Sequence, residues 1–445
     1  MKYDIKLNFT ILFVFAIMFA TIVINPSGIK AQESLDLNAE SAILVDFDTG
    51  KILYSKNPDA TIPPASMTKM MTEYLVLEAI QNGEISWDTT TEISDYAYSI
   101  SANDAFSGVG LKQDQPYTVK ELYEAMAINS DNATTIALAE LIAGSEGEFV
   151  KLMNQKAEEM GLSEFEFVNS TGLDNADLAG NHPEGTDSDD LNLLSARSTA
   201  LLAYNLVHDF PEVLDTSSIP ETEFADQSIR NWNWMLPHEA SFLEQFFYEG
   251  VDGLKTGYTE SGGNSFAGTA IRNGNRLITV VMKTDSKEER FEETAKLLDY
   301  GFKNFQTQEL FAEGYQLDGK STLPVQKGKE DTVKVSLGDA ISVPIKSEDA
   351  EQYSIEYVID QDKLNEDGEL TAPIEKGEVV GTVNLVFEGE NDYGYIISKN
   401  SSSVPLVTED GVEKANWFML TLGAIGDFFA NIFTSAVDWI KGLFS

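Results

Sequence analysis

Cysteine and clustered histidine are missing from this sequence. No cysteine occurs in 445 residues, so neither a disulfide nor a thiolate metal site can stabilise the protein or take part in its chemistry. The three histidines, His182, His208 and His238, lie far apart and show no H-x-H or H-E-x-x-H spacing. We therefore predict no metal site and no cofactor, and we expect the histidines to be ordinary loop or surface residues.

Basic residues are also scarce. Thirty Lys and Arg stand against 73 Asp and Glu, which gives a formal net charge of -43 at pH 7. A surface this acidic repels the phosphates of nucleic acids and of anionic lipids, so we expect no nucleic-acid partner. The hydrophobic content of 42% is sufficient for folded cores, and the length allows two or three domains.

The N-terminus has the layout of a secretory signal peptide. Two early lysines precede an uncharged, mostly apolar stretch at residues 9–24, and Pro26, Gly28 and Ala31 follow it. These features match the n-region, h-region and cleavage site of an export signal, so we predict a signal peptide over residues 1–31. An uncleaved membrane anchor is the alternative, although the stretch is short for a span. Both interpretations export the rest of the chain.

The pattern of the next region predicts an α+β domain over residues 32–308. Two β-rich runs flank Asp48-Thr49-Gly50 and predict a hairpin. Helical patterns fill residues 63–144, with a helix opening at a Thr118 cap and another stopping at Gly144. Strand patterns return late in the domain, in VDGLKTGY, SFAGTAIRNG and RLITVVMKT. Helices inserted between early and late strands indicate the α+β class.

Two further segments follow. Residues 309–405 alternate apolar and polar residues between turn signals, as in VKVSLGDAISVPIK, and predict a small all-β domain. Residues 414–445 form an amphipathic pattern. We expect this tail to be a helix that lies in a membrane interface, since it has aromatic residues at both ends and no charge-free run of spanning length. A helix packed on its own protein is the alternative. The apolar face comprises Trp417, Phe418, Ile425, Phe428, Phe429, Ile432, Trp439, Ile440 and Leu443.

A lysine lies among apolar residues one turn after a serine in PPASMTKMMTEYL, residues 63–75. We predict a helix from Met67 to Ile80, which places Lys69 within reach of the Ser66 hydroxyl. Serine is a weak nucleophile until a base removes its proton, and a desolvated lysine, or one beside another cation, can be that base. The two prolines favour a position for Ser66 near the helix N-terminus, where backbone N–H groups can stabilise an oxyanion.

Two other motifs strengthen this weak S-x-x-K signal. About two S-x-x-K matches are expected by chance in a chain of this length, whereas K-T-G is expected only about 0.1 times. This chain has S-D-N at residues 130–132, between two predicted helices, and K-T-G at residues 255–257, on a predicted late strand. Ser101-Ala102-Asn103 also fits S-x-N, but it lies in a loop, so we prefer Ser130.

The three motifs are those of class A β-lactamases and penicillin-binding proteins, and the chain resembles the second group. It is similar to the serine-type D-alanyl-D-alanine carboxypeptidases, the low-molecular-mass penicillin-binding proteins, of Gram-positive type. The stretches PPASMTK, NSDNA, STGLD, LSAR and DGLKTGYT carry the resemblance, which covers almost all of the mature chain. It implies a β-lactamase/transpeptidase-like catalytic domain, a small all-β domain and a C-terminal amphipathic helix that holds the protein at the outer face of the cytoplasmic membrane.

The resemblance also implies roles for the catalytic residues. Ser66 would be acylated by the penultimate D-alanine of a peptidoglycan stem peptide, with Lys69 as its base. Ser130 would relay the proton to the leaving D-alanine. The oxyanion hole would be the backbone N–H groups of Ser66 and Tyr258. Penicillins and other β-lactams would acylate the same serine.

Further residues would bind the substrate. Asn132 would hydrogen-bond its amide, and Lys255 would attract its terminal carboxylate and depress the proton affinity of the catalytic lysine. Thr256, which precedes Gly257, would hydrogen-bond that carboxylate, although both could be ordinary strand residues. Arg290 occupies the position of a carboxylate-binding arginine in the family. Alternatively, Arg290 could be one member of a run of charged residues on the surface.

The sequence departs from the family at Thr171 in STGLD, where related sequences can carry a histidine, so any role for this position is open. The acidic loop at residues 175–192 follows. It is either a functional insertion or a tolerated solvated loop.

Three alternatives remain at this point. A β-lactamase shares the motifs, but the class A E-x-x-L-N pattern is absent, because Ser188 replaces the glutamate in SDDLN. An endopeptidase or transpeptidase of the same fold is chemically close. An inert wall-binding scaffold would have no need for the serines and lysines of the three motifs.

Overall fold

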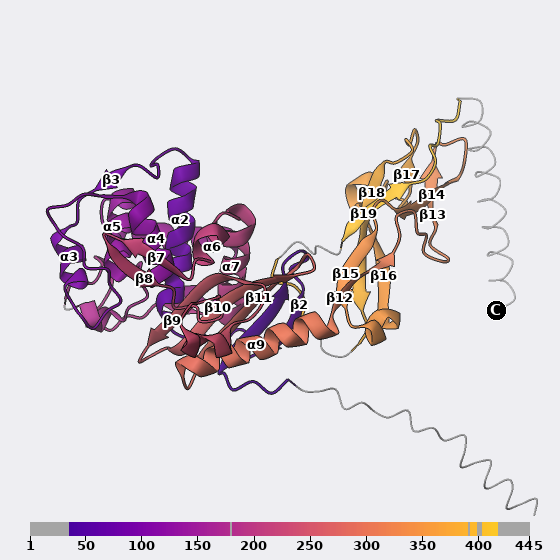
Figure 1. Cartoon of the computed structure of the whole chain (residues 1–445). Coiled ribbons are helices and arrows are strands. Elements are labelled where there is room, and N and C mark those ends of the chain that lie inside the picture. The colour runs from indigo at the N-terminus through magenta and orange to yellow at the C-terminus, as the bar shows by residue number, and fades with distance from the viewer. Residues whose placement is uncertain (1–34, 179, 390–391, 398–402, 417–445) are drawn as a thin grey trace, which may run out of the picture. The chain divides into compact units, whose positions relative to one another are not determined.

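The computed structural model describes residues 35–178, 180–389, 392–397 and 403–416 (Figure 1). The predicted signal peptide and, except for three residues, the predicted membrane helix at 414–445 lie outside the described residues. Within the described part of the chain, no helix is long and apolar enough to cross a membrane. All elements below belong to the unit Asn38–Ser445.

A five-stranded antiparallel sheet forms the centre of the first domain, in the order β2-β1-β11-β10-β9. The predicted hairpin around Asp48-Thr49-Gly50 is confirmed, since the flanking strands pair with Leu44 opposite Tyr54. The predicted late strands are also confirmed, and they form a meander that adds to the hairpin. The strands are β1 (Ser41–Asp46), β2 (Ile52–Lys56), β9 (Val251–Thr259), β10 (Gly263–Arg272) and β11 (Asn275–Thr284).

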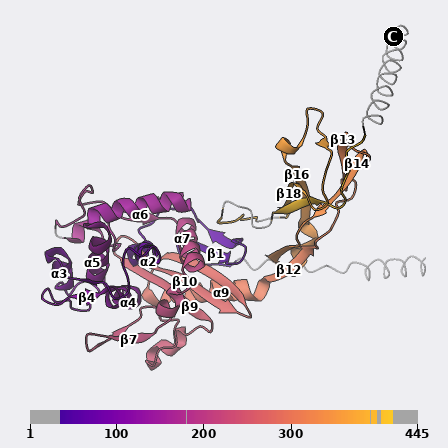
Figure 2. The same cartoon turned by 90° about the horizontal axis from the view of Figure 1, so that it is seen from above.

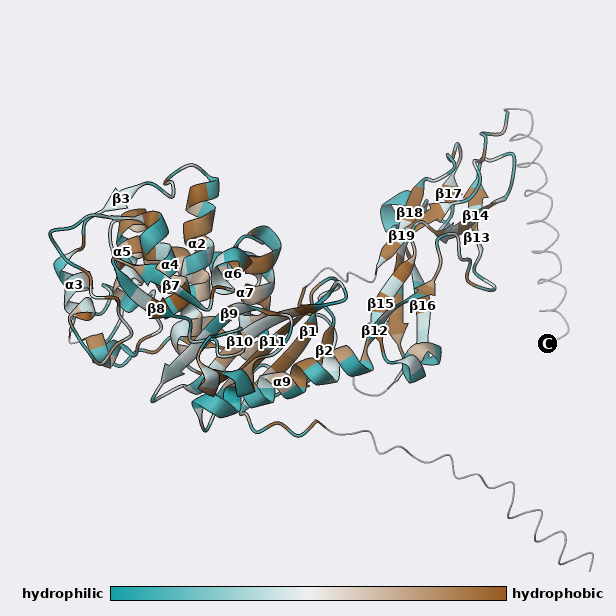
Figure 3. Ribbon diagram, in the orientation of Figure 1, coloured by the Kyte–Doolittle hydropathy of each residue, from teal (hydrophilic) through white to brown (hydrophobic). Residues whose placement is uncertain are grey.

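Helices cover both faces of this sheet. All six residues of β1 are buried, which requires cover on each side. Figure 1 shows α9 (Lys287–Asn304) along one face and α7 (Ala196–Asp209) over the other. Gly301 allows α9 to approach closely, because a Cβ there would lie 2.6 Å from a methyl group of Leu277. The hydrophobic colouring of β1 in Figure 3 agrees with its burial.

The other helices are inserted between β2 and β9, as the sequence predicted. Figure 2 shows α2, α4 and α5 grouped together, and these three helices contact one another. The helices are α2 (Lys69–Gln81), α3 (Asp95–Ser101), α4 (Val119–Asn129), α5 (Asn132–Ala143), α6 (Glu146–Met160) and α8 (Val213–Ser217). Short 3₁₀ turns are η1 (Ala65–Thr68), η2 (Asn175–Leu178) and η3 (Ser241–Phe246), and the small ladders are β3 (Thr90–Thr91) with β4 (Tyr117–Thr118), β5 (Phe165–Glu166) with β6 (Leu193–Leu194), and β7 (Glu221–Phe224) with β8 (Gln227–Arg230).

The predicted helix ends are confirmed. Thr118 and Glu121 form a reciprocal capping box at the start of α4. Gly144 ends α5 in the left-handed conformation, with φ of 80°. The helix predicted from Met67 begins two residues earlier, as η1, and continues as α2.

The second domain is rich in strands and has its own core. Strands β12 (Gln306–Phe311) and β15 (Ile341–Ile345) form one ladder. The order β16-β18-β19-β14-β13-β17 forms a second sheet. Figure 3 shows hydrophobic and hydrophilic residues mixed along these strands. They are β13 (Thr322–Gln326), β14 (Thr332–Leu337), β16 (Tyr353–Ile359), β17 (Leu370–Thr371), β18 (Val379–Phe387) and β19 (Val404–Thr408), with the 3₁₀ turns η4 (Ser347–Gln352) and η5 (Gln361–Lys363).

Two strands cross the predicted limits of this domain. Strand β12 starts at Gln306, before the predicted boundary at 308, and pairs with β15 through Gln306 and Ile345. Strand β19 continues to Thr408, beyond the predicted end at 405. The pairing partners lie far away in the sequence, so a local alternation pattern does not fix these ends.

Candidate active site

Ser66 and Lys69 lie at the start of the helix that the sequence predicted. Ser66 is in η1 and half-buried, and Lys69 is the first residue of α2 and fully buried. The Lys69 Nζ lies 3.1 Å from Ser66 Oγ, 2.8 Å from Asn132 Oδ1 and 2.7 Å from the Thr171 carbonyl oxygen. A neutral Lys69 amine has a lone pair that can accept the Ser66 proton, so the pair has the geometry of a nucleophile and its base.

The surroundings of Lys69 favour its neutral form. Burial lowers the pKa of Lys69 well below its usual range, and the positive charge of Lys255 lowers it further. Asp131, Glu73 and Glu146 act in the opposite direction, but burial is the largest effect. Lys69 can therefore carry a free amine at a pH where an exposed lysine is charged.

Two glycines clamp the backbone beside Ser66. A Cβ on Gly257 would lie 2.3 Å from the Pro64 carbonyl oxygen, and one on Gly172 would lie 1.8 Å from the Ala65 carbonyl oxygen. No side chain fits at either position, so the K-T-G glycine lets β9 approach η1 closely. This contact brings the strand that carries Tyr258 to the serine.

The S-D-N motif forms the turn between α4 and α5. Ser130 takes the left-handed conformation, with φ of 62°, and ends α4. Asp131 caps α5, and its carboxylate accepts from the Thr134 and Val109 backbone N–H groups, each at 2.6 Å. This tight turn places Asn132 against Lys69.

Asn132, which we expect to hydrogen-bond the substrate amide, already makes two hydrogen bonds within the protein. Its oxygen accepts from Lys69, and its amide nitrogen donates to the Ser107 carbonyl oxygen at 3.3 Å. One amide hydrogen remains for a substrate. Ser130 is buried, and within the described part of the chain its side chain makes no hydrogen bond. The competing Ser101 is the last residue of α3 and does not lie in a loop as predicted, and its hydroxyl accepts from the Leu111 N–H at 2.7 Å.

Strand β9 carries the K-T-G residues. Lys255 and Thr256 are 3% and 6% exposed, whereas Tyr258 is 53% exposed. Burial lowers the pKa of Lys255, and the negative charge of Glu73 opposes that effect. Among the described residues, neither the Lys255 ammonium nor the Thr256 hydroxyl makes a hydrogen bond, so both are available to a ligand.

Arg290 points into the domain and does not lie with the surface charges of α9. It is 2% exposed, whereas the neighbouring Lys287 and Glu288 are exposed. Its Nη1 donates to the Gly257 carbonyl oxygen at 3.2 Å, and its buried Nε has no hydrogen-bond partner in the described structure. Burial disfavours the charged guanidinium and so lowers its pKa, and an anion bound beside Arg290 would offset this loss of hydration.

Sequence analysis missed several residues around the lysine. The Thr171 position contributes its backbone carbonyl and not its side chain, which bonds to Asn169. Glu146 supports this loop by accepting from the Ser170 N–H and hydroxyl. No local spacing in the sequence predicts these contacts, because they join residues that are far apart in the chain. Glu73, in contrast, lies four residues after Lys69, and helical periodicity could have identified it.

The acidic loop is tied to the same region through asparagines. The Asn169 amide donates to Asn175 Oδ1 at 3.0 Å, and Asn175 in turn donates to Thr186 Oγ1 at 3.0 Å and to the Asp187 carbonyl at 2.8 Å. These bonds join Asn175, the first residue of the loop, to the preceding segment and to Thr186 and Asp187 within the loop. A functional role for this loop stays a prediction.

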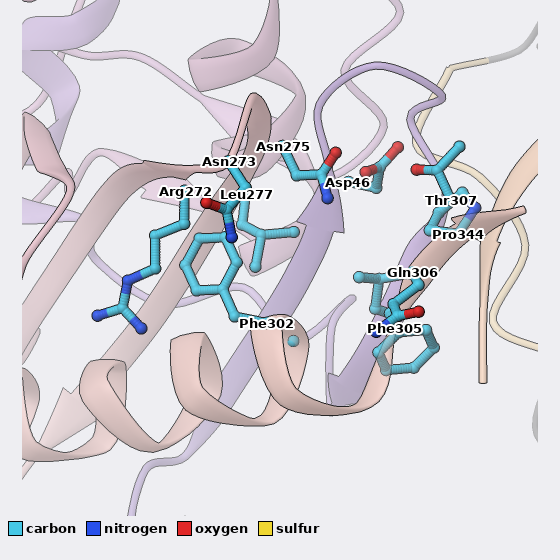
Figure 4. Close-up of a pocket in the computed structure, with 12 residues that line it drawn as sticks. Asp46, Arg272, Asn273, Asn275, Leu277, Phe302, Phe305, Gln306, Thr307 and Pro344 are labelled. Atoms are coloured by element: carbon cyan, nitrogen blue, oxygen red, sulfur yellow. The ribbon is translucent and has the colours of Figure 1, made fainter. Parts of the chain in front are cut away.

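A separate cavity of about 400 Å³ lies beside the β10–β11 turn and the end of α9 (Figure 4). Its lining includes Asp46, Arg272, Asn275, Phe302 and Thr307. It contains none of the predicted site residues. The carboxylate of Asp46 is already bonded to the Thr49 N–H and hydroxyl, at 2.9 and 2.6 Å.

Comparison with protein families gives two matches. Residues 28–286 match the family model of D-alanyl-D-alanine carboxypeptidases, and residues 305–414 match that of the C-terminal domain of penicillin-binding protein 5.

Individual proteins match over most of the chain. The chain is 30% identical over 400 residues to the D-alanyl-D-alanine carboxypeptidase DacF of Bacillus subtilis, covering 90% of this chain and 92% of DacF. It is 30% identical over 412 residues to DacC of Escherichia coli, covering 91% of each chain. Among solved structures, a peptidoglycan synthesis regulatory factor (PBP3) from Streptococcus pneumoniae is 36% identical, with a TM-score of 0.66, over 84% of this chain and 99% of that one. Penicillin-binding protein 5 from Haemophilus influenzae is 28% identical, with a TM-score of 0.65, over 85% and 98%.

Proposed function

Because the chain belongs to the D-alanyl-D-alanine carboxypeptidase family, we propose that Ser66 is the nucleophile that removes the terminal D-alanine from peptidoglycan stem peptides. The observation that carries this assignment is the 3.1 Å contact between Ser66 Oγ and the fully buried Lys69 Nζ. A serine beside a desolvated amine is the arrangement that acyl transfer requires.

In the acylation step, Ser66 Oγ attacks the carbonyl carbon of the penultimate D-alanine, and its proton passes to Lys69. The oxygen of the tetrahedral intermediate accepts from the backbone N–H groups of Ser66 and Tyr258. The C–N bond then breaks, and the amine of the terminal D-alanine leaves with the proton, which Ser130 relays from Lys69. The product is an ester between Ser66 and the shortened peptide.

Water completes the reaction. It attacks the ester carbonyl carbon while Lys69 accepts a proton, and the bond to Ser66 Oγ breaks as that oxygen regains a proton. The enzyme returns to its starting state, and the peptide ends in a new carboxylate. No cofactor takes part in this scheme.

Three residues bind the terminal carboxylate of the substrate in this proposal. Lys255 and Arg290 supply positive charge, and the Thr256 hydroxyl donates a hydrogen bond. Within the described residues, the buried Arg290 Nε has no hydrogen-bond partner and the Lys255 ammonium makes no hydrogen bond, and both observations support this role. Asn132 contributes its remaining amide hydrogen to the substrate backbone. Because catalysis needs neutral Lys69 and charged Lys255, acylation should rise and then fall as the pH increases.

β-Lactams would acylate the same serine and leave it slowly. A class A β-lactamase needs a carboxylate that activates a water for hydrolysis. The buried Glu146 near Lys69 has one oxygen bonded to Ser170 and the other to the Tyr96 hydroxyl at 2.9 Å. It is therefore occupied, which favours carboxypeptidase over β-lactamase activity.

The proposed location is the cell envelope. Export through a signal peptide at residues 1–31 and peripheral attachment through an amphipathic helix at 414–445 rest on the sequence patterns. They place the catalytic domain at the outer face of the cytoplasmic membrane, where peptidoglycan stem peptides are found.

Release of D-alanine tests the function. The purified protein is incubated with a diacyl-L-Lys-D-Ala-D-Ala peptide, beside the Ser66→Ala variant, and free D-alanine is measured. We expect release by the wild type and none by the variant. No release from folded wild-type protein would contradict the proposal and favour cross-link cleavage or a non-catalytic wall protein.

A further inference from the structure

Two carbonyl oxygens orient the amine of Lys69. The Thr171 carbonyl oxygen and Asn132 Oδ1 accept from Lys69 Nζ, at 2.7 and 2.8 Å, and neither oxygen can donate a hydrogen bond. A neutral amine has two hydrogens and one lone pair, so these two acceptors take both hydrogens. The third contact of Lys69 Nζ is Ser66 Oγ at 3.1 Å, and the lone pair is left to face the serine proton. The position of the Thr171 carbonyl therefore decides where the base points.

The Thr171 carbonyl belongs to the same peptide unit as the Gly172 N–H. This unit is trans and planar, so its C=O and N–H point in opposite directions. The Gly172 N–H donates to Asn169 Oδ1 at 2.7 Å, at the opposite edge of the unit from Lys69. Asn169 and Lys69 thus hold the two edges of one rigid group. Without the Asn169 side chain, the peptide unit can rotate and carry its carbonyl away from Lys69.

The fully buried Asn169 also binds the rest of this turn from the inside. Its Oδ1 accepts from the Thr171 N–H at 3.1 Å and from the Thr171 hydroxyl at 2.9 Å. Its amide nitrogen donates to the Leu173 carbonyl oxygen at 2.7 Å and to Asn175 Oδ1 at 3.0 Å, which uses both amide hydrogens. Aspartate lacks these donors and alanine lacks the acceptor as well, so the set of bonds requires an asparagine.

Two helices hold the turn one residue before the carbonyl. Thr72 on α2 donates to the Ser170 carbonyl oxygen at 2.9 Å. Glu146 on α6 accepts from the Ser170 N–H at 2.9 Å and from its hydroxyl at 2.5 Å. These contacts fix where the turn lies in the domain. The orientation of the next peptide unit, between residues 171 and 172, depends on Asn169.

We propose that Asn169 is a positioning residue for the reaction, which aims the Thr171 carbonyl at Lys69 and thereby directs the lone pair of the base to Ser66. The inference rests on the proposed function of the site. It adds a residue that none of the three motifs contains and that does not itself touch the reacting atoms.

Loss of this orientation should slow acylation without weakening binding. Lys255, Thr256 and Arg290, which bind the carboxylate in the proposal, lie on β9 and α9, and none of the bonds of the turn involves them. In Asn169→Ala, we expect the first-order rate constant for acylation to fall about a hundredfold, because a misplacement of about 1 Å is enough for such a loss. The dissociation constant of the initial complex should stay within about twofold of the wild type.

The experiment measures both constants for the full-length protein with benzylpenicillin, by rapid mixing over a range of concentrations. Asn154→Ala is the matched control. Asn154 binds the same chain segment two residues earlier, since its Oδ1 accepts from the Phe167 N–H at 3.1 Å and its amide donates to the Phe167 carbonyl oxygen at 2.8 Å. We expect Asn154→Ala to lower the thermal midpoint as Asn169→Ala does, but to keep the wild-type rate constant.

A second variant keeps Asn169 and tests the same turn. Thr171→Val has the shape of threonine without its hydroxyl, so it removes the bond to Asn169 Oδ1 and the acceptor of the Leu173 N–H, at 3.1 Å. We expect the rate constant for acylation to fall about tenfold, and Thr171→Ser, which keeps the hydroxyl, to recover most of that loss.

Four outcomes would overturn the inference. A rate constant for folded Asn169→Ala within about threefold of the wild type would show that the base needs no such support. Equal losses in Asn169→Ala and Asn154→Ala would indicate a general loosening of the segment. A change confined to the dissociation constant would assign Asn169 to ligand binding. If Asn169→Ala does not fold, an unchanged rate constant in Thr171→Val would contradict the proposal.

The proposed function fails in a different way. If benzylpenicillin does not acylate the folded wild type at Ser66, the assignment of the nucleophile is refuted, whatever the variants show. Normal acylation of the wild type together with any of the four outcomes above would refute only the role of Asn169.

Discussion

The two domains bury different kinds of residue. In the second domain, the buried polar side chains among the described residues are Ser336 and Thr408, and both make hydrogen bonds. The first domain buries a cluster of charged groups around one helix start, comprising Lys69, Glu73, Asp131, Glu146, Lys255 and Arg290.

This difference matters because charged groups, unlike apolar ones, are costly to bury. Burying an ion costs several kcal/mol unless partners compensate, and an apolar replacement is often as stable. The core of the second domain, as far as the structure describes it, contains no buried charged groups of this kind. The charged cluster therefore lowers the stability of the first domain, and it lies at the site where the proposed reaction needs charged groups.

Replacing the base gives the largest expected effect. Lys69→Met should lower the rate of acylation by benzylpenicillin about a thousandfold, since general-base catalysis is lost. Lys156→Met, at a partly exposed ion pair on α6, is the control and should keep the wild-type rate. A rate for Lys69→Met within tenfold of the wild type would show that another group removes the Ser66 proton.

Adding a side chain at a glycine that contacts the backbone beside Ser66 should give the second largest effect, a loss of folding stability. Gly172→Ala places a Cβ 1.8 Å from the Ala65 carbonyl oxygen at a φ of +83°, so we expect a loss of about 3–4 kcal/mol in the free energy of unfolding. Gly161→Ala has a similar φ of +76° but open space around it, and should cost about 1 kcal/mol. Equal losses in denaturant titrations would contradict the steric clamp.

A cavity in the second domain should leave the chemistry intact. Leu406→Ala, at a fully buried position, should cost about 3 kcal/mol in the stability of that domain. Because its core contains no site residue, the rate of acylation by benzylpenicillin at 25 °C should not change. A parallel loss of acylation would mean that the site depends on the second domain.

Loss of a helix cap should give the smallest effect. Thr118→Ala removes the capping box of α4, and we expect a loss of about 1 kcal/mol in the free energy of unfolding. Thr91→Ala is a suitable control, because its hydroxyl bonds to the adjacent Glu92 carbonyl at 3.3 Å at an exposed position. An unchanged midpoint for Thr118→Ala would show that the cap is not needed.

The local features of the fold could be predicted from the sequence, because each depends on neighbouring residues. The hairpin at Asp48-Thr49-Gly50, the Thr118 cap and the Gly144 stop are such features. The position of β12 could not be predicted, because its partner strand lies more than thirty residues later.

In the site, too, local features could be predicted and contacts between distant segments could not. Ser66 and Lys69 could be paired from helical spacing, and motif order related them to Ser130 and Lys255. The contact between Lys69 and the Thr171 carbonyl could not be foreseen, because it joins residues 102 positions apart and uses the backbone. Burial of the cluster, which sets its pKa values, is a property of the assembled fold.

The protonation state of Lys69 tests the account most directly. Its Nζ can be followed by ¹⁵N NMR of lysine-labelled protein as a function of pH, with Lys69→Met to assign the signal. We predict that Lys69 titrates well below the ordinary lysine pKa of 10.5, because burial and Lys255 disfavour its charge. Titration of Lys69 near 10.5 would contradict its assignment as the base that activates Ser66.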